Sequence, residues 1–163
     1  MISVQDLFFK QVIQDTNLHG TTYTSPTIDI FNLAGVASKA LIVVAVGTNT
    51  DNITTLKLQG SNDDSNYEDV SGGVVGTDVD VNGDVSVLPG TTFDNEAIAF
   101  TVNTNSGAYR YYQVVAAADS AGSSCHIGIY ALLGHRGNVV VPQDVATGVN
   151  TLMCVPPVIP ESH

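Results

Sequence analysis

The stretch 39–73 constrains the fold of this chain more than any other. It opens with an apolar run over 40–46 that is rich in β-branched residues, and both faces of that run are apolar, which is typical of a central strand buried on both sides. Polar turn residues separate the run from a second expected strand over 53–59 and follow that strand over 60–66. A short extended piece resumes at 67–70. Strands joined by polar turns within one block predict an all-β domain.

The same alternation of apolar and polar residues predicts further strands along the chain. They are expected over residues 27–31, 79–81, 85–87, 96–102, 109–117 and 125–133. Two of them carry clear inward faces, Ile98, Phe100 and Val102 in one and Cys125, Ile127, Ile129, Ala131 and Leu133 in the other. About eight strands at this spacing predict an antiparallel, jelly-roll-like β-sandwich.

Three regions follow from this pattern, with a sandwich core over residues 27–137 between two arms. Residues 1–26 are an N-terminal arm in which a short helix over 4–14 and an extended segment are both open, since the apolar residues fit neither period well, and in which 15–26 is a loop or an extended arm. Residues 138–163 form an apolar, Pro-rich C-terminal arm that needs a surface to lie on, in its own domain or in another subunit. The residues expected at that interface are Val139, Val140, Val141, Val155, Val158 and Ile159.

The two parts of the C-terminal arm are expected to bind differently. Val139, Val140 and Val141 have high β propensity and precede Pro142, so they suit addition to a sheet edge. The prolines from 156 onward favour an extended path that presents valines and Ile159 to shallow pockets. An apolar tail with no evident place in a small sandwich also predicts a homo-oligomer.

Charge excludes two classes of partner. The 163 residues contain 16 acidic and five basic side chains, so the surface repels both phosphate backbones and anionic membranes. No apolar run approaches ~18 residues, and no basic region followed by an apolar one predicts a signal peptide. We therefore expect a protein that binds neither nucleic acid nor membrane, with Cys125 and Cys154 reduced in a cytosol.

Catalytic sequence motifs are absent, and no enzyme activity or cofactor is predicted. The four histidines (His19, His126, His135 and His163) are scattered, and Cys125 and His126 are expected on opposite faces of a strand. Asp94 and Glu96 resemble a glycosidase pair in spacing, but on an acidic protein a solvated edge explains them as well. No catalytic residue is therefore assigned.

One motif, Asp78-x-Asp80-x-Asn82-Gly83-Asp84, matches the opening of a calcium-binding loop. The acidic residue that such a loop needs at its twelfth position is replaced by Pro89, and no flanking helices are evident. A β-hairpin explains the same residues. A three-residue loop with Gly83 in the left-handed conformation places Val79, Val85 and Val87 on one face and leaves the aspartates exposed. The hairpin is the preferred interpretation, with calcium as the alternative.

Several segments together resemble small structural proteins of tailed bacteriophages, the head decoration or cement proteins, including those of cyanophages. The resemblance covers roughly residues 27–137. In the first half it is carried by Ile28-Asp29-Ile30, by the apolar strand 40–46, and by the pattern from Leu56 to Val70, which includes Gly60-Ser61 and Asp63-Asp64-Ser65. In the second half it is carried by Tyr109-Arg110-Tyr111-Tyr112 and by the closing segment 129–136.

The resemblance implies a β-sandwich that forms a homotrimer on the capsid exterior, after synthesis in the host cytoplasm. Its partner would be the major capsid protein, and it would stabilise the shell by bridging capsomers. The family supplies no catalytic residues. The alternative function is a glycan-binding adhesin module of a head fibre or tail, for which Tyr109, Tyr111 and Tyr112 are candidate stacking residues. Strand alternation places these tyrosines on two faces, and Trp is absent, so core and rim packing explains them better.

Overall fold

All regular secondary structure that the structure describes is β-strand. The computed structural model describes residues 7–30, 37–103, 109–135 and 151–155. The ten strands are β1 (Leu7–Asn17), β2 (Thr22–Thr24), β3 (Ile28–Asp29), β4 (Ala37–Asn49), β5 (Ile53–Ser61), β6 (Glu68–Val74), β7 (Glu96–Asn103), β8 (Tyr111–Ala118), β9 (Cys125–His135) and β10 (Thr151–Val155). No helix long and apolar enough to cross a bilayer is found within these ranges.

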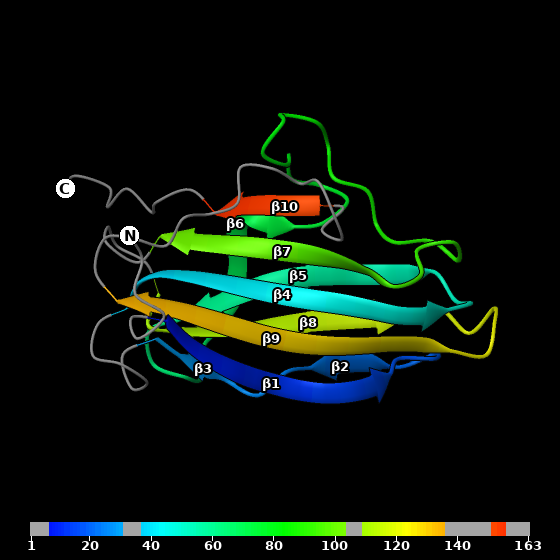
Figure 1. Ribbon diagram of the computed structural model, residues 1–163, viewed down its shortest axis with the longest axis horizontal. Coiled ribbons are helices and arrows are strands. Elements are labelled where there is room, and N and C mark those ends of the chain that lie inside the picture. Colours follow the sequence, from blue (N-terminus) through cyan, green and yellow to red (C-terminus); the bar gives the residue numbers. More distant parts are fainter. Residues whose placement is uncertain (1–6, 31–36, 104–108, 136–150, 156–163) are drawn as a thin grey trace.

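The strands form two sheets that face each other (Figure 1). Sheet A has the order β1-β9-β4-β7-β10, and sheet B has the order β2-β8-β5-β6, with β3 also paired to β8. All pairings are antiparallel except that of β10, which runs parallel to β7. The predicted all-β sandwich is confirmed. There are ten strands instead of about eight. Three of them, β1, β2 and β10, come from residues outside the expected 27–137 core, whereas the expected strands 79–81 and 85–87 are joined only by the isolated bridge between Val79 and Val85.

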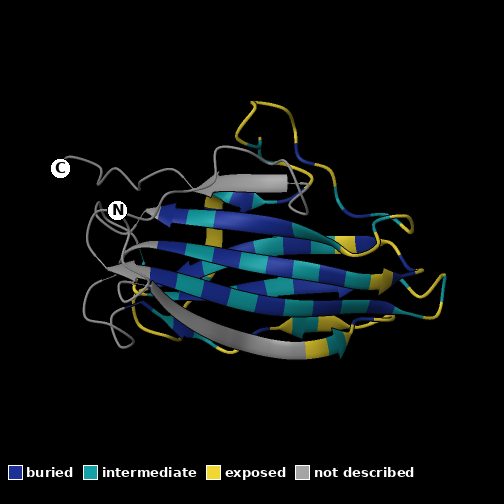
Figure 2. Ribbon diagram, viewed as in Figure 1, coloured by how far each residue is buried: buried dark blue, intermediate teal, exposed yellow. Residues whose placement is uncertain are grey.

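The core lies between the sheets and is filled by alternate residues of the central strands. All eight predicted inward residues of β7 and β9 are buried, as are Leu56 and Leu58 of β5. The predicted burial of both faces of 40–46 is wrong, however. Alternate residues from Ala40 to Val46 are buried, whereas Leu41 and Val43 on the opposite face are only half-buried (Figure 2). Sheet B covers only the inner face of sheet A, so β4 is central within its sheet but open on its outer side.

Of the two conformations left open for the first residues, the described part, 7–17, takes the extended one. β1 pairs with β9 along the edge of sheet A, and β2 pairs with β8 in sheet B, so the chain joins both sheets before residue 26. No helix forms over 7–14. Register shifts between Gln11 and Ile13 and between Ile13 and Thr16 break the two-residue alternation. These shifts explain why the sequence of this strand shows no clean period.

Part of the predicted C-terminal arm also belongs to the sandwich. Residues Thr151–Val155 form β10, which extends sheet A beside β7 of the same chain. Val155 is the last residue of that strand. The predicted sheet-edge segment 139–141 and the residues Val158 and Ile159 lie outside the described residues, so their roles stay predictions.

Candidate functional site

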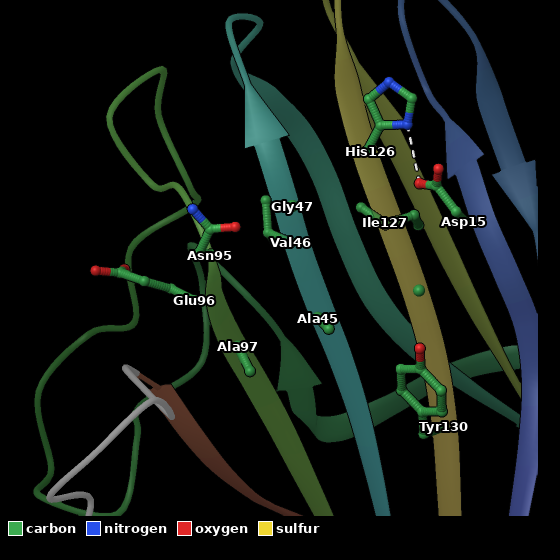
Figure 3. A pocket seen from close by; sticks show the side chains of 11 residues that line it. Asp15, Ala45, Val46, Gly47, Asn95, Glu96, Ala97, His126, Ile127 and Tyr130 are labelled. Atoms are coloured by element: carbon green, nitrogen blue, oxygen red, sulfur yellow. Dashed lines mark hydrogen bonds and ion pairs between the residues drawn. The ribbon is translucent and has the colours of Figure 1, made fainter.

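A shallow furrow crosses the outer face of sheet A. Its floor is a row of small residues that register brings together, since Ala45 of β4 is paired with Gly128 of β9 on one side and with Ala97 of β7 on the other. Three neighbouring strands thus carry almost no side-chain bulk at one level, which leaves a hollow of ≈ 470 Å³ (Figure 3). The strands fix this hollow rigidly, because every floor residue lies inside a hydrogen-bonded ladder.

Polar side chains stand at the rim of the furrow. Nδ1 of His126 lies 2.9 Å from Oδ1 of Asp15, and both side chains are substantially exposed, so their attraction is screened by water (Figure 3). Tyr130 lies beside Gly128, where a Cβ would come within 3.2 Å of the tyrosine ring. None of the eleven described lining residues is Ser, Thr, Cys or Lys. Glu96 also lines the furrow, which therefore combines a floor of small residues with the ionisable side chains of Asp15, Glu96, His126 and Tyr130.

The outer face around the furrow is apolar. Leu41 and Val43 of β4 and Leu132 of β9 are half-buried there. Between residues 41–47 of β4, 97–101 of β7 and 126–132 of β9, the other residues that share this face are uncharged apart from His126; they are Ala45, Gly47, Ala97, Ala99, Thr101, Gly128 and Tyr130. Asp15 and Glu96 line the furrow beside them. On a chain with a formal net charge of −11, this is a broad uncharged surface. We call it the outer face of sheet A.

One end of the sandwich is held by a buried carboxylate. The Asp51 side chain is fully buried, and its Oδ2 lies 2.7 Å from Nδ1 of His19. Its other oxygen accepts a hydrogen bond from the backbone N–H of Gly122. The three residues lie in the loops β4–β5, β1–β2 and β8–β9. Asp51 therefore joins three connections that are far apart in the sequence.

Neighbouring side chains complete this set of contacts. The Asp119 carboxylate accepts hydrogen bonds from the Asn52 side chain at 2.8 Å and from the N–H of Ala121 at 3.1 Å. Both hydrogen bonds lower the pKa of Asp119, and the bond from Asn52 contributes most. Oγ1 of Thr50 accepts hydrogen bonds from the N–H groups of Ser123 and Ser124 at 2.9 and 3.0 Å. These contacts tie the loops at this end of the sandwich to one another, and we refer to it as the locked end.

The three candidate stacking tyrosines are divided as expected. Tyr112 is buried in the core, and burial raises the pKa of its hydroxyl. The Tyr109 hydroxyl donates to Glu68 at 2.6 Å, and that hydrogen bond raises the pKa of Tyr109 to about 12. Tyr111 lies under the guanidinium of Arg110, 4.7 Å from the ring centre to Cζ. The Arg110 guanidinium in turn makes two hydrogen bonds to Asp29. These residues do not form one stacking platform.

The candidate calcium residues belong to the hairpin instead. Gly83 has φ of +87°, the Asp80 N–H donates to the Asp84 carbonyl at 2.8 Å, and the Gly83 N–H donates to the Asp80 carbonyl at 3.1 Å. The three-residue loop and the left-handed glycine are thus confirmed. Oδ1 of Asp80 accepts from the N–H groups of Asn82 and Asp84. These carboxylate contacts are explained by turn formation alone, and no group of three or more metal-ligating side chains occurs among the described residues.

The orientation of this hairpin differs from the prediction. Val79 and Val85 pair across it, as expected for one apolar face, but that face points to solvent. Asp78 and Asp80 are half-buried, whereas the valines are exposed. The polar residues turn inward because their side chains bond the backbone of the hairpin and of the adjoining turn.

The remaining candidate residues have structural partners. Cys125 is free and buried, and burial raises the pKa of its thiol to about 11; Cys125 and His126 face opposite ways, as predicted. Oδ1 of Asp94 accepts a hydrogen bond from the Asn49 N–H at 2.7 Å, so Asp94 fixes the loop before β7.

Comparisons with protein-family models, curated proteins and solved structures found no match to this chain.

Proposed function

We propose that this chain is a structural virion protein that decorates the outside of a tailed-bacteriophage capsid and stabilises it by bridging capsomers as a homotrimer. The observation that carries the proposal is the outer face of sheet A. Elsewhere the surface of this chain is acidic, so two copies repel each other, but across 41–47, 97–101 and 128–132 this face carries no charged side chain, and Asp15 and Glu96 lie only at its furrow. Apolar, half-buried side chains on the face of a sheet are also suited to subunit packing.

Two further features support a scaffold that binds other proteins. The locked end ties three loops to one buried carboxylate, which suits a protein that must keep its shape in an exposed position. Among the described residues, no buried side-chain nitrogen or oxygen lacks a hydrogen-bond partner. The sequence resemblance to decoration proteins supplies the capsid as the site of action and the major capsid protein as the partner.

The test is whether the polypeptide purifies with intact virions in a fixed ratio to a major capsid protein. We expect a constant ratio, together with a scattering mass of about three times the 17.0 kDa chain for the assembled form. A chain absent from purified virions, and monomeric at tens of micromolar, would contradict the proposal.

A second candidate function, a glycan-binding adhesin module, is favoured by the furrow alone. Tyr130 supplies an aromatic ring there, and Asp15 and His126 supply hydrogen-bonding groups at the rim. Binding to a glycan array that is lost on Tyr130→Ala, with no association with virions, would support this function over the first.

A further inference from the structure

The hairpin between β6 and β7 exposes apolar side chains that a folded domain normally buries. Its valines, Val79, Val81, Val85 and Val87, are 52, 40, 61 and 75% exposed, and they are the large hydrophobic residues that are exposed within the described ranges. The segment projects from the sandwich (Figure 1) and is largely exposed along its length (Figure 2). Apolar patches with polar surroundings mark sites of protein–protein contact.

The hairpin holds its shape without a partner. Oγ of Ser86 donates to the Asp78 carbonyl at 2.7 Å and accepts from the Gly76 N–H at 3.0 Å. Oδ2 of Asp78 accepts from the N–H of Val74 at 2.8 Å, which anchors the hairpin to the end of β6. Together with the Asp80 contacts in the turn, these bonds fix the backbone in advance. Binding through a preformed surface loses little conformational entropy.

A hairpin that packs on its own domain turns its apolar face inward and its polar face to solvent, and this hairpin does the reverse. Ser86 is 5% exposed and faces the body of the protein, while Val85 and Val87 on either side of it face solvent. Cross-strand pairing places Val79 on the same face as Val85. The polar side chains of the hairpin thus form internal hydrogen bonds, while its valines face solvent. We call Val79, Val81, Val85 and Val87 the valine ridge.

Charge indicates what kind of surface this ridge meets. Between residues 58 and 109 the chain contains no Lys, Arg or His. Of the nine acidic residues in this range, Asp78, Asp80 and Asp84 are the charged side chains of the hairpin itself; the other six lie in the β5–β6 loop, in β6 and around the start of β7, and Asp69 is paired with Lys57 at 2.8 Å. A second copy, itself at −11, is repelled by this region. A surface bordered by Lys and Arg is attracted to it.

We propose that hairpin 78–88 docks its valine ridge into an apolar groove bordered by Lys or Arg on a different protein. The proposal rests on the proposed function, in which that protein is the shell protein of the capsid. It separates two surfaces, since the outer face of sheet A packs sister copies and the hairpin attaches the assembly to the shell.

The experiment measures binding of the full chain to capsid shells prepared without it. Val85→Thr/Val87→Thr keeps the β-branched shape and removes apolar surface, and we expect binding at least about tenfold weaker. The matched control, Val85→Ile/Val87→Ile, keeps the ridge apolar and should bind as tightly as the wild type or more tightly. Asp84→Asn should weaken binding about two- to threefold at low salt and have no effect at high salt. Because these side chains are exposed, melting temperatures should stay within about 2 °C.

The outcomes separate the two proposals. If the wild type binds shells and the threonine variant binds equally well, the docking role of the hairpin is wrong while the capsid function stands. If the wild type does not bind shells at all, the capsid function fails and the docking proposal fails with it. If the threonine variant instead loses self-association, the ridge belongs to the contact between copies and the proposal is overturned.

Discussion

At the scale of single residues, Asp51 joins three loops through one buried carboxylate. It is fully buried, and its two oxygens bind His19 and the backbone of Gly122. Asp51→Ala leaves the Gly122 N–H without its acceptor and releases the loops, so the free energy of unfolding should fall by about 2–3 kcal/mol. Urea unfolding measures this change. The control Asp84→Ala removes an exposed carboxylate and should change stability by less than about 0.5 kcal/mol; equal effects would mean that Asp51 does not lock the loops.

Gly122 provides a second test at the same end of the molecule. A Cβ at this position would overlap the carbonyl group of Thr50, which is backbone and cannot move aside. Gly122→Ala should therefore lower the melting temperature by several degrees, equivalent to about 2 kcal/mol or more. At Gly90 an added Cβ has its nearest neighbour at 3.7 Å, so Gly90→Ala should leave the melting temperature nearly unchanged. Similar shifts for both variants would show that the fit at Gly122 is loose.

At the scale of strands, sequence periodicity predicted the elements whose side chains alternate cleanly. β7 and β9 have the predicted inward faces because each packs one side on the core. For β1 the sequence left a helix and an extended segment both open, because its register shifts break the alternation. The furrow could not be predicted at all, since Ala45, Ala97 and Gly128 are brought together only by strand register. The hairpin turn was predicted from Asn82-Gly83, but its outward face depends on tertiary hydrogen bonds that no local pattern contains.

The strand β10 alters the expectation for the C-terminal segment. It covers the edge of β7, so a chain ending at residue 137 exposes the backbone N–H and C=O groups of that edge. We expect the shortened chain to keep the strand signal in circular dichroism, because β1 to β9 remain, but to unfold at lower urea and to form larger assemblies at high concentration. A control chain that lacks only 156–163 should retain the stability of the full protein. A truncated chain as stable and as soluble as the full chain would show that β10 does not protect the edge.

At the scale of the whole molecule, acid should destabilise the fold. The pKa of Asp63 is lowered chiefly by a hydrogen bond from the Asn66 N–H, that of Asp69 by Lys57, and that of Asp119 by Asn52. A carboxylate whose pKa is lower in the folded state stabilises the fold above its unfolded pKa, and this contribution is lost as pH falls through the folded value. The free energy of unfolding should therefore decrease progressively below about pH 4. Urea unfolding at several pH values tests this, and Asp119→Asn should make the decrease shallower. A stability that rises on acidification would contradict the assignment.

The last prediction concerns the assembly of copies through the outer face of sheet A. Val43 lies in the middle of that face, paired with Tyr130 of β9 and Ala99 of β7. Because the rest of the acidic surface repels a second copy, copies must approach each other through this face. Val43→Asp places a carboxylate there, so two copies that pack through this face would repel each other. Light scattering should then show the mass of a single chain where the wild type shows the larger assembly.

A control with the same charge distinguishes contact from general repulsion. Thr91→Asp adds a carboxylate at an exposed loop position away from the strands, so it should leave the assembly intact. Val43→Thr keeps the β-branched shape and should weaken assembly without abolishing folding, which circular dichroism checks for all three variants. If Val43→Asp and Thr91→Asp lower the mass equally, net charge controls association. If neither does, copies do not pack through this face.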